Sequence, residues 1–274
     1  MTRRDAVGKH VTVRAEPRRI VSLAPAITEI LFALGLERRI VGVTQYCDYP
    51  AAAASKPKVG GIVNPSLERV LAQRPELVIG MRLNPKPVLR MLANARIPTY
   101  AADPRSVEQV LETIAAVGAL TGQRERAANL VRRLRGRVQG VAQRVRGLPR
   151  PTVLLVYQQA PLWVAGAGTF PDNLIHIAGG HNAAADVRGY KQYSVERLLA
   201  HDPQVILLTS MTDADSAAQR REFIARPSMR GLAAVRGGKV YVVNADIVDR
   251  AGPRIVDGLE EIAARLHPAR LTRR

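Results

Sequence analysis

Cysteine, aromatic side chains and long apolar runs are all scarce in this sequence. Cys47 is the only cysteine among 274 residues, which excludes an internal disulfide and a zinc site built from several cysteines. Aromatic residues make up 4% of the chain, so each aromatic residue in a loop is a candidate for function. The best apolar stretch, residues 20–36, contains Pro25 and Glu29 and falls short of a membrane span.

Acidic residues are also few relative to basic ones. The chain has 41 Lys and Arg against 23 Asp and Glu, a net charge of +18, which raises the question of nucleic-acid binding. The basic residues gather in 121–150 and at the two termini, however, and no helix-turn-helix, zinc-finger or RNA-binding signature is present. We therefore interpret them as the solvated arginine face of a helix, with no nucleic-acid partner, and keep a basic nucleic-acid-associated protein as a remote alternative.

Catalytic machinery is missing as well. No nucleophile–base pairing, phosphate-binding loop or metal triad appears, and neither Gly60-Gly61 nor residues 166–168 match a dinucleotide fingerprint. The sequence therefore predicts a binding protein with no catalytic residue, no metal ligand and no cofactor of its own. A corrinoid-processing enzyme is the remote alternative. The basic start of the chain is followed by no apolar segment or cleavage site, so no signal peptide is visible.

Short β-branched runs alternate with segments of helical periodicity, which indicates an α/β fold with parallel sheets and helices on their faces. Strands are expected at 20–23, 40–43, 77–79, 99–101, 153–156, 205–208 and 239–243, and helices at 25–34, 67–73, 88–95, 172–178, 195–201 and 253–266.

Between these two series lies a long segment without proline. Glycines near Thr121 predict a break, after which a helix of roughly 25 residues, about 37 Å long, should follow. We therefore expect an N-terminal α/β lobe over 1–105, a connecting helical spine over 106–148, and a C-terminal α/β lobe with a closing helix over 149–274.

An internal repeat relates the two lobes. Residues 66–79 and 194–207 each read as a serine N-cap, a glutamate in the first helical turn, an apolar stripe, a proline stop and a buried strand. The two copies fall on either side of the predicted spine, which indicates a duplicated architecture.

Several segments, in this order, carry a family resemblance. Residues 19–31, the motif Tyr-Cys-Asp-Tyr-Pro at 46–50, both Ser-x-Glu-Arg segments, residues 178–182 and residues 249–255 resemble the helical-spine (class III) periplasmic substrate-binding proteins of ABC importers. That class carries cobalamin, haem and iron-siderophores, and the 46–50 motif is most similar to its cobalamin-binding branch. The resemblance implies two Rossmann-like lobes with parallel sheets, joined by one long α-helix, with the ligand in the cleft between the lobes.

Three aromatic residues are candidates for ligand contact, because a flat, mostly apolar macrocycle needs aromatic faces and a few polar groups. Tyr46 follows a predicted strand, at the edge where ligands approach an open α/β sheet. Trp163, in a predicted loop, and Tyr190 match positions where the family presents aromatics to its ligands.

The loop before the last helix matches a ligand-touching loop of the cobalamin branch. The residues that the resemblance assigns to ligand binding there are Asp246, Ile247, Val248, Asp249 and Arg250. Asp249 and Arg250 could equally pair with each other or with the helix end. The sequence departs from the enteric cobalamin binders at 60–64, where it has no tryptophan.

Glu68 and Glu196 occupy equivalent positions of the repeat. Their place in a first helical turn is explained by the helix dipole alone. The resemblance adds docking to the membrane permease subunits of an ABC importer, one glutamate per lobe, which would fix orientation more than affinity.

Together these features predict a monomeric substrate-binding protein that delivers cobalamin or a similar corrinoid, as transported ligand, to an ABC importer. The family places such a protein in the periplasm or at the cell surface. Haem or an iron-siderophore is the alternative ligand, and His176 or His181 could be a metal ligand, for instance axial to haem. Cys47, inside the 46–50 motif, could touch a cobalt or iron centre.

Overall fold

The computed structural model describes residues 1–211 and 216–271. The chain divides into two compact units, each with its own sheet: unit 1 comprises residues 1–104 and 108–134, and unit 2 comprises residues 105–107 and 135–274. The segment 106–148, for which a separate connecting role was expected, is divided between the units: residues 108–134 belong to unit 1, and residues 106–107 and 135–148 belong to unit 2.

The sheet of unit 1 has four parallel strands in the order β4-β3-β5-β6, and all four were predicted. The strands are β3 (Ile20–Ser22), β4 (Ile40–Val43), β5 (Leu77–Met81) and β6 (Thr99–Ala102). A separate two-stranded hairpin, β1 (Thr2–Arg4) and β2 (His10–Thr12), precedes them and was not predicted.

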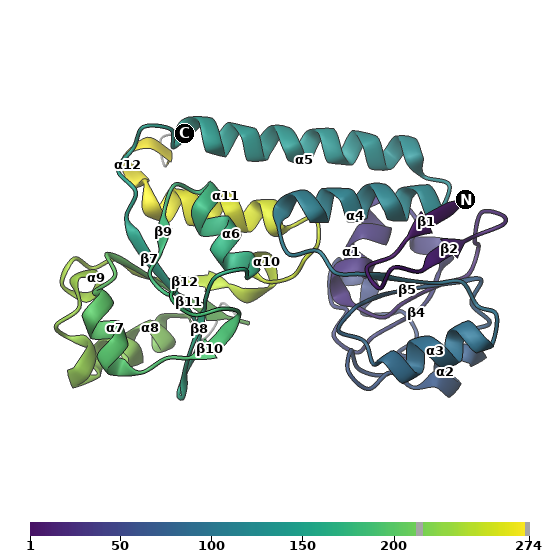
Figure 1. The fold of residues 1–274 in the computed structure, drawn as a ribbon, viewed down its shortest axis with the longest axis horizontal. Coiled ribbons are helices and arrows are strands. Elements are labelled where there is room, and N and C mark those ends of the chain that lie inside the picture. Colours follow the sequence, from purple (N-terminus) through teal and green to yellow (C-terminus); the bar gives the residue numbers. More distant parts are fainter. Residues whose placement is uncertain (212–215, 272–274) are drawn as a thin grey trace. The chain divides into compact units, whose positions relative to one another are not determined.

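Helices cover both faces of this sheet (Figure 1). They are α1 (Pro25–Ala33), α2 (Leu67–Ala72) and α3 (Lys86–Asn94). α1 begins with Pro25; proline has no backbone N–H, so it leaves no hydrogen-bond donor unsatisfied in the first helical turn. The helix ends before Gly35, which has a φ of 73°. Val21 and Val78 of the sheet pack with Val70 and Leu92 of α2 and α3.

Two helices follow β6, α4 (Val107–Leu120) and α5 (Arg124–Arg144). They are separated at Gly122, which has a φ of 75°, so the predicted break is confirmed. α5 has 21 residues and is about 32 Å long, shorter than predicted.

α5 is continuous from unit 1 into unit 2 and is anchored in each. In unit 1, Arg126 Nη1 donates to the Leu34 carbonyl at 3.2 Å. In unit 2, Arg137 Nη2 pairs with Asp257 at 2.6 Å and with Glu260 at 2.7 Å, and these bonds hold its pKa above the usual value.

The sheet of unit 2 is mixed rather than wholly parallel. Its order is β10-β8-β7-β11-β12, with β9 paired to β7. The strands are β7 (Thr152–Gln159), β8 (Leu162–Ala165), β9 (His181–Asn182), β10 (Tyr190–Gln192), β11 (Val205–Ser210) and β12 (Val240–Asn244). β7, β11 and β12 are parallel, as expected, whereas β8 folds back antiparallel on β7 and β10 pairs antiparallel with β8.

Unit 2 also carries helices on both faces of its sheet (Figure 1). They are α6 (Phe170–Ile177), α7 (Val195–His201), α8 (Ser216–Ala225), α9 (Ala233–Arg236), α10 (Ala245–Val248), α11 (Ile255–Leu266) and α12 (Pro268–Leu271). Across the described residues, no helix is both long enough and apolar enough to cross a membrane.

Candidate ligand-binding site

Tyr46 lies three residues beyond the carboxyl end of β4, and 51% of its surface is exposed. Its ring approaches the loop at Gly61, where a methyl group placed on Gly61 would lie 3.6 Å from Tyr46 Cε2. The carboxyl edge of a parallel sheet is where ligands approach this class of fold. Tyr46 therefore lies past a strand end, as the sequence predicted, with its ring open to solvent.

Asn84 fixes the loops beside Tyr46. Its side chain is buried; Nδ2 donates to the carbonyls of Leu23 at 3.0 Å and Ile62 at 2.8 Å, and Oδ1 accepts from Met81 N at 2.6 Å. The loops after β3 and β5 are thereby tied to the loop at 60–65. Since a buried amide with satisfied hydrogen bonds is costly to disturb, this edge of unit 1 is a fixed frame.

Two exposed aliphatic side chains stand on this frame. Val63 is 63% exposed and Leu83 is 68% exposed, and each adjoins a partner in the Asn84–Ile62 hydrogen bond. With Tyr46 they form what we call the apolar rim of unit 1. Val63 and Leu83 were not predicted, although each directly precedes an asparagine, a turn residue beside which an apolar side chain has little packing to do.

Tyr157 and Tyr190 form an aromatic pair in unit 2. Their ring centroids are 5.3 Å apart with an interplanar angle of 59°, a tilted arrangement that favours edge-to-face attraction. Tyr157 lies near the carboxyl end of β7 and is 48% exposed. It was not predicted, because the apolar run that indicated this strand ends at Val156.

Asp249 joins this pair as a hydrogen-bond acceptor, since the Tyr190 hydroxyl donates to its Oδ1. Burial raises the pKa of Asp249, and the hydrogen bond from Tyr190 partly offsets that effect. Burial and the neighbouring Asp249 carboxylate also raise the pKa of Tyr190, so its phenol stays protonated at neutral pH. The group is thus a protonated phenol held by a partly desolvated carboxylate.

The segment predicted as a loop at 246–250 begins as the short helix α10. Arg250 Nε pairs with Asp246 Oδ1 at 2.8 Å, and both side chains are largely buried. Ile247 is half-buried. Val248 is fully buried, so the assignment of Val248 to ligand contact is wrong: its side chain packs inward from α10.

Trp163 lies in strand β8 and not in a loop, which corrects the sequence-based expectation. It pairs with Gln158 of β7 and Gln192 of β10, and its side chain is half-buried. The chain turns at residues 160–161 and returns beside β7, a hairpin that the sequence analysis did not recognise.

The structure places two of the side chains considered as metal ligands: Cys47 is enclosed within the loop of Tyr46, and His181 lies at the far end of its sheet. Cys47 is 1% exposed, with Thr28 Oγ1 at 3.1 Å and Thr44 Oγ1 at 3.2 Å from its sulfur. His181 pairs with Thr152 at the amino end of β7, away from the carboxyl edge. In the part of the chain that the structure describes, no three His, Cys, Asp or Glu side chains are grouped as a metal site would require.

Glu68 and Glu196 are both exposed and lie in equivalent helix starts, as the repeat predicts. Ser66 Oγ accepts from Arg69 N at 3.3 Å, and Ser194 Oγ accepts from Arg197 N at 3.2 Å. A backbone hydrogen bond, and next the Ser194 side chain, lower the pKa of Glu196. Both carboxylates are therefore available on the surface.

Comparison with known proteins places these features in a family. The model of the periplasmic binding protein family matches residues 20–247. A cobalamin-binding protein of Halobacterium salinarum is 30% identical over 274 residues, 97% of this chain and 74% of the relative.

Two solved structures are similar to the chain along nearly its whole length. The periplasmic vitamin B12-binding protein of Vibrio cholerae has a TM-score of 0.83 at 27% identity, covering 93% of this chain and 98% of that one. The periplasmic heme-binding protein of Roseiflexus sp. RS-1 in its apo form has a TM-score of 0.83 at 29% identity, covering 92% and 98%. B12 and heme binders are thus equally similar in fold, and neither ligand is singled out. The chain belongs to the periplasmic binding proteins, the substrate-binding components of ABC transporters, and is not an enzyme.

Proposed function

We propose that this protein delivers a corrinoid, cobalamin or a close relative, to an ABC importer from outside the cytoplasm, in the periplasm or at the cell surface. The observation that carries the proposal is the exposed Tyr46 in the Tyr-Cys-Asp-Tyr-Pro loop, supported by the fixed frame around Asn84. A corrin ring is a broad, mostly apolar disc rimmed by amides, which suits a surface of one aromatic and two aliphatic side chains.

The polar part of the ligand would be recognised in unit 2. We assign ligand contact to Tyr157, Tyr190 and Asp249, with Trp163 contributing an aromatic edge. The Asp246–Arg250 ion pair, with Ile247 beside it, completes the ligand surface in this proposal. Phenol and carboxylate groups can donate to and accept from corrin amides, and the hydrogen bond between Tyr190 and Asp249 holds both in place before the ligand arrives.

Haem is the alternative ligand, and one feature of unit 2 disfavours it. Haem iron takes an axial ligand from the protein, commonly histidine or tyrosine. The raised pKa of Tyr190 opposes formation of a phenolate there, and His181 lies at the amino end of β7. Cobalamin carries its own axial ligands and makes no such demand on the protein.

The permease would be recognised through Glu68 and Glu196. Both carboxylates are exposed at the start of a serine-capped helix, so each can meet a basic pocket without rearrangement. We propose that a monomer presents both charges, and that they orient the loaded protein on the importer.

The test is titration of the purified protein with cyanocobalamin, haemin and a ferric hydroxamate siderophore. Because Trp163 is the only tryptophan, quenching of its fluorescence reports on unit 2. We expect saturable one-to-one quenching by cyanocobalamin, and no protein-induced shift of the haemin Soret band. Tight binding of haemin with a Soret shift, and none of cyanocobalamin, would overturn the corrinoid assignment.

A further inference from the structure

A cavity lies wholly within unit 1, at the edge of the sheet opposite to Tyr46. It has a volume of about 500 Å³, within the range of sites for small organic ligands. The cavity runs along β6, whereas Tyr46 follows β4, the other edge strand. Its lining is therefore distinct from the apolar rim, although Arg82 of the cavity directly precedes Leu83 of the rim.

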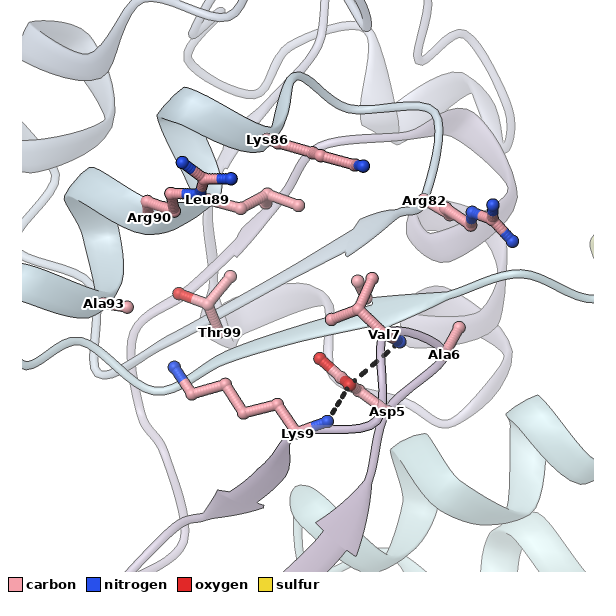
Figure 2. A pocket seen from close by; sticks show the side chains of 11 residues that line it. Asp5, Ala6, Val7, Lys9, Arg82, Lys86, Leu89, Arg90, Ala93 and Thr99 are labelled. Carbon is pink, nitrogen blue, oxygen red and sulfur yellow. Dashed lines mark hydrogen bonds between the residues drawn. The ribbon is translucent and has the colours of Figure 1, made fainter.

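The cavity has three walls (Figure 2). The first is one face of α3, which bears Lys86, Leu89 and Arg90, and the second is formed by Thr99 and Ala101 of β6. The third wall is the loop of the N-terminal hairpin, residues 5–9, which is joined to the edge strand by a hydrogen bond from Ala6 N to the Ala101 carbonyl at 2.8 Å. The hairpin thus turns an open sheet edge into one side of a pocket.

Positive charge dominates the lining, which contains Lys9, Arg82, Lys86 and Arg90. Its one acidic residue is Asp5, whose Oδ1 already accepts from the backbone N–H groups of Val7 and Lys9 at 3.0 and 2.7 Å (Figure 2). Arg82 pairs with Asp103 at 3.2 Å. Within residues 1–211 and 216–271, no acidic side chain pairs with Lys9, Lys86 or Arg90.

Like charges around one cavity repel each other, and a bound anion would relieve that repulsion. The two lysines and Arg90 suit a phosphate group, because lysine supplies a compact charge and arginine can bind two oxygens at once. The lining also includes apolar surface from Val7 and Leu89, which a bare inorganic ion would leave uncovered.

From this arrangement we infer that the cavity along β6 binds a phosphate monoester, with the cations holding the phosphate and Val7 and Leu89 contacting the organic group. The ligand is either a free ester or the headgroup of a phosphatidic-acid-like lipid. This site is independent of the corrinoid proposal, so either can fail without the other.

The first experiment is calorimetric titration of the full-length protein with phenyl phosphate at constant ionic strength. We expect saturable one-to-one binding, weakened about tenfold for each cation removed in K86Q and R90Q, and weaker binding of inorganic phosphate. The matched control is R133Q/R146Q, which removes two exposed arginines outside the cavity and should bind as wild type. Absence of saturable binding, equal loss in the control, or equal affinity for inorganic phosphate would overturn the inference.

A further variant keeps the inference testable if K86Q or R90Q fails to fold. Val7→Asp places a carboxylate in the cavity on an exposed loop residue and should abolish phenyl phosphate binding while cyanocobalamin binding stays unchanged. Unaltered phenyl phosphate binding by this variant would overturn the site.

Vesicles distinguish the two sources of the ligand. Preferential sedimentation with phosphatidic acid over phosphatidylglycerol vesicles of equal charge, lost in K86Q/R90Q, would identify a lipid headgroup. No sedimentation with either vesicle, alongside phenyl phosphate binding, would identify a free ester. If wild type and variant sedimented equally with both vesicles, and phenyl phosphate did not bind saturably, vesicle binding would be explained by net charge alone. That result would overturn the inference.

Discussion

The two units share a scaffold but present different chemistry. Each has a serine-capped helix followed by a proline stop and a central buried strand, α2 and β5 in unit 1 and α7 and β11 in unit 2. At the carboxyl edge of its sheet, unit 1 exposes an apolar rim, whereas unit 2 carries a hydrogen-bonded phenol and carboxylate. A duplicated frame can therefore keep its surface glutamates equivalent while the loops at the carboxyl edges of its sheets diverge.

The strongest test of whether Glu68 and Glu196 are equivalent reverses the charge of both side chains. Glu68→Arg with Glu196→Arg should lower substrate uptake through the reconstituted importer more than about tenfold, because each charge would meet a basic pocket with the wrong sign. Ligand affinity measured in solution should not change.

The matched control for this reversal is Glu125→Arg, which alters another exposed glutamate in a first helical turn, that of α5. It should transport as wild type. If one reversal of the pair abolished uptake and the other had no effect, the two helix starts would be equivalent in structure only.

The second test compares two asparagines. Asn84→Ala should lower the free energy of unfolding by about 3 kcal/mol, because it leaves buried loop groups without partners, and should also weaken ligand binding. Asn182→Ala breaks comparable hydrogen bonds, to the Ala165 carbonyl and from Ala184 N at 3.0 Å each, but beside the amino end of β7. It should lower stability in urea unfolding and leave ligand affinity unchanged. Loss of affinity in both variants would mean that general loosening, and not the rim, is responsible.

The third test separates surface area from hydrogen bonding. Tyr46→Ala should weaken cyanocobalamin binding about tenfold by removing an aromatic face, whereas Tyr46→Phe should retain affinity. Tyr190→Phe should weaken binding, since Asp249 loses its donor. Fluorescence titration measures all three, with Tyr241→Ala as the control, because Tyr241 lies near the start of β12 against Arg265. Equal effects of the two Phe substitutions would remove the proposed contrast between the units.

The smallest expected effect concerns Glu196. Because its folded-state pKa is lowered below the usual 4.5, its ionised form stabilises the fold above that pH, and the contribution is lost as the pH falls through the folded-state pKa. Glu196→Gln should therefore be slightly less stable than wild type at pH 7, and the difference should disappear once the pH is below the folded-state pKa. Ser194→Ala, which removes one cause of the shift, should reduce this pH dependence. A stability difference that stayed constant as the pH was lowered would indicate a contact other than charge.

Periodicity located most of the scaffold because buried parallel strands and capped helices have strong local signals. Pro25 and Gly35 bound α1, and Ser66 and Ser194 cap their helices as expected. Strand β8 was missed because its pairing depends on a turn and on contacts with β7 that the local sequence does not encode.

The candidate site was only partly predictable for a related reason. Tyr46 could be found because it follows a strand within a recognisable motif. Tyr157 lies past the point where the apolar run of its strand stops, and the role of Asn84 depends on carbonyls 61 and 22 residues away in the chain. Such ties arise only when distant loops meet, and no spacing rule reveals them.

The hydrogen bonds of the Asn84 side chain limit how the apolar rim of unit 1 can change in evolution. Because Asn84 fixes the backbone of its neighbours, the outward side chains at 63 and 83 can be exchanged without altering the paths of the loops that carry them. If the proposed ligand contact at this rim holds, a tryptophan introduced at position 63 would change specificity alone. New ligands could be reached by substitution at the surface while the supporting frame is inherited intact.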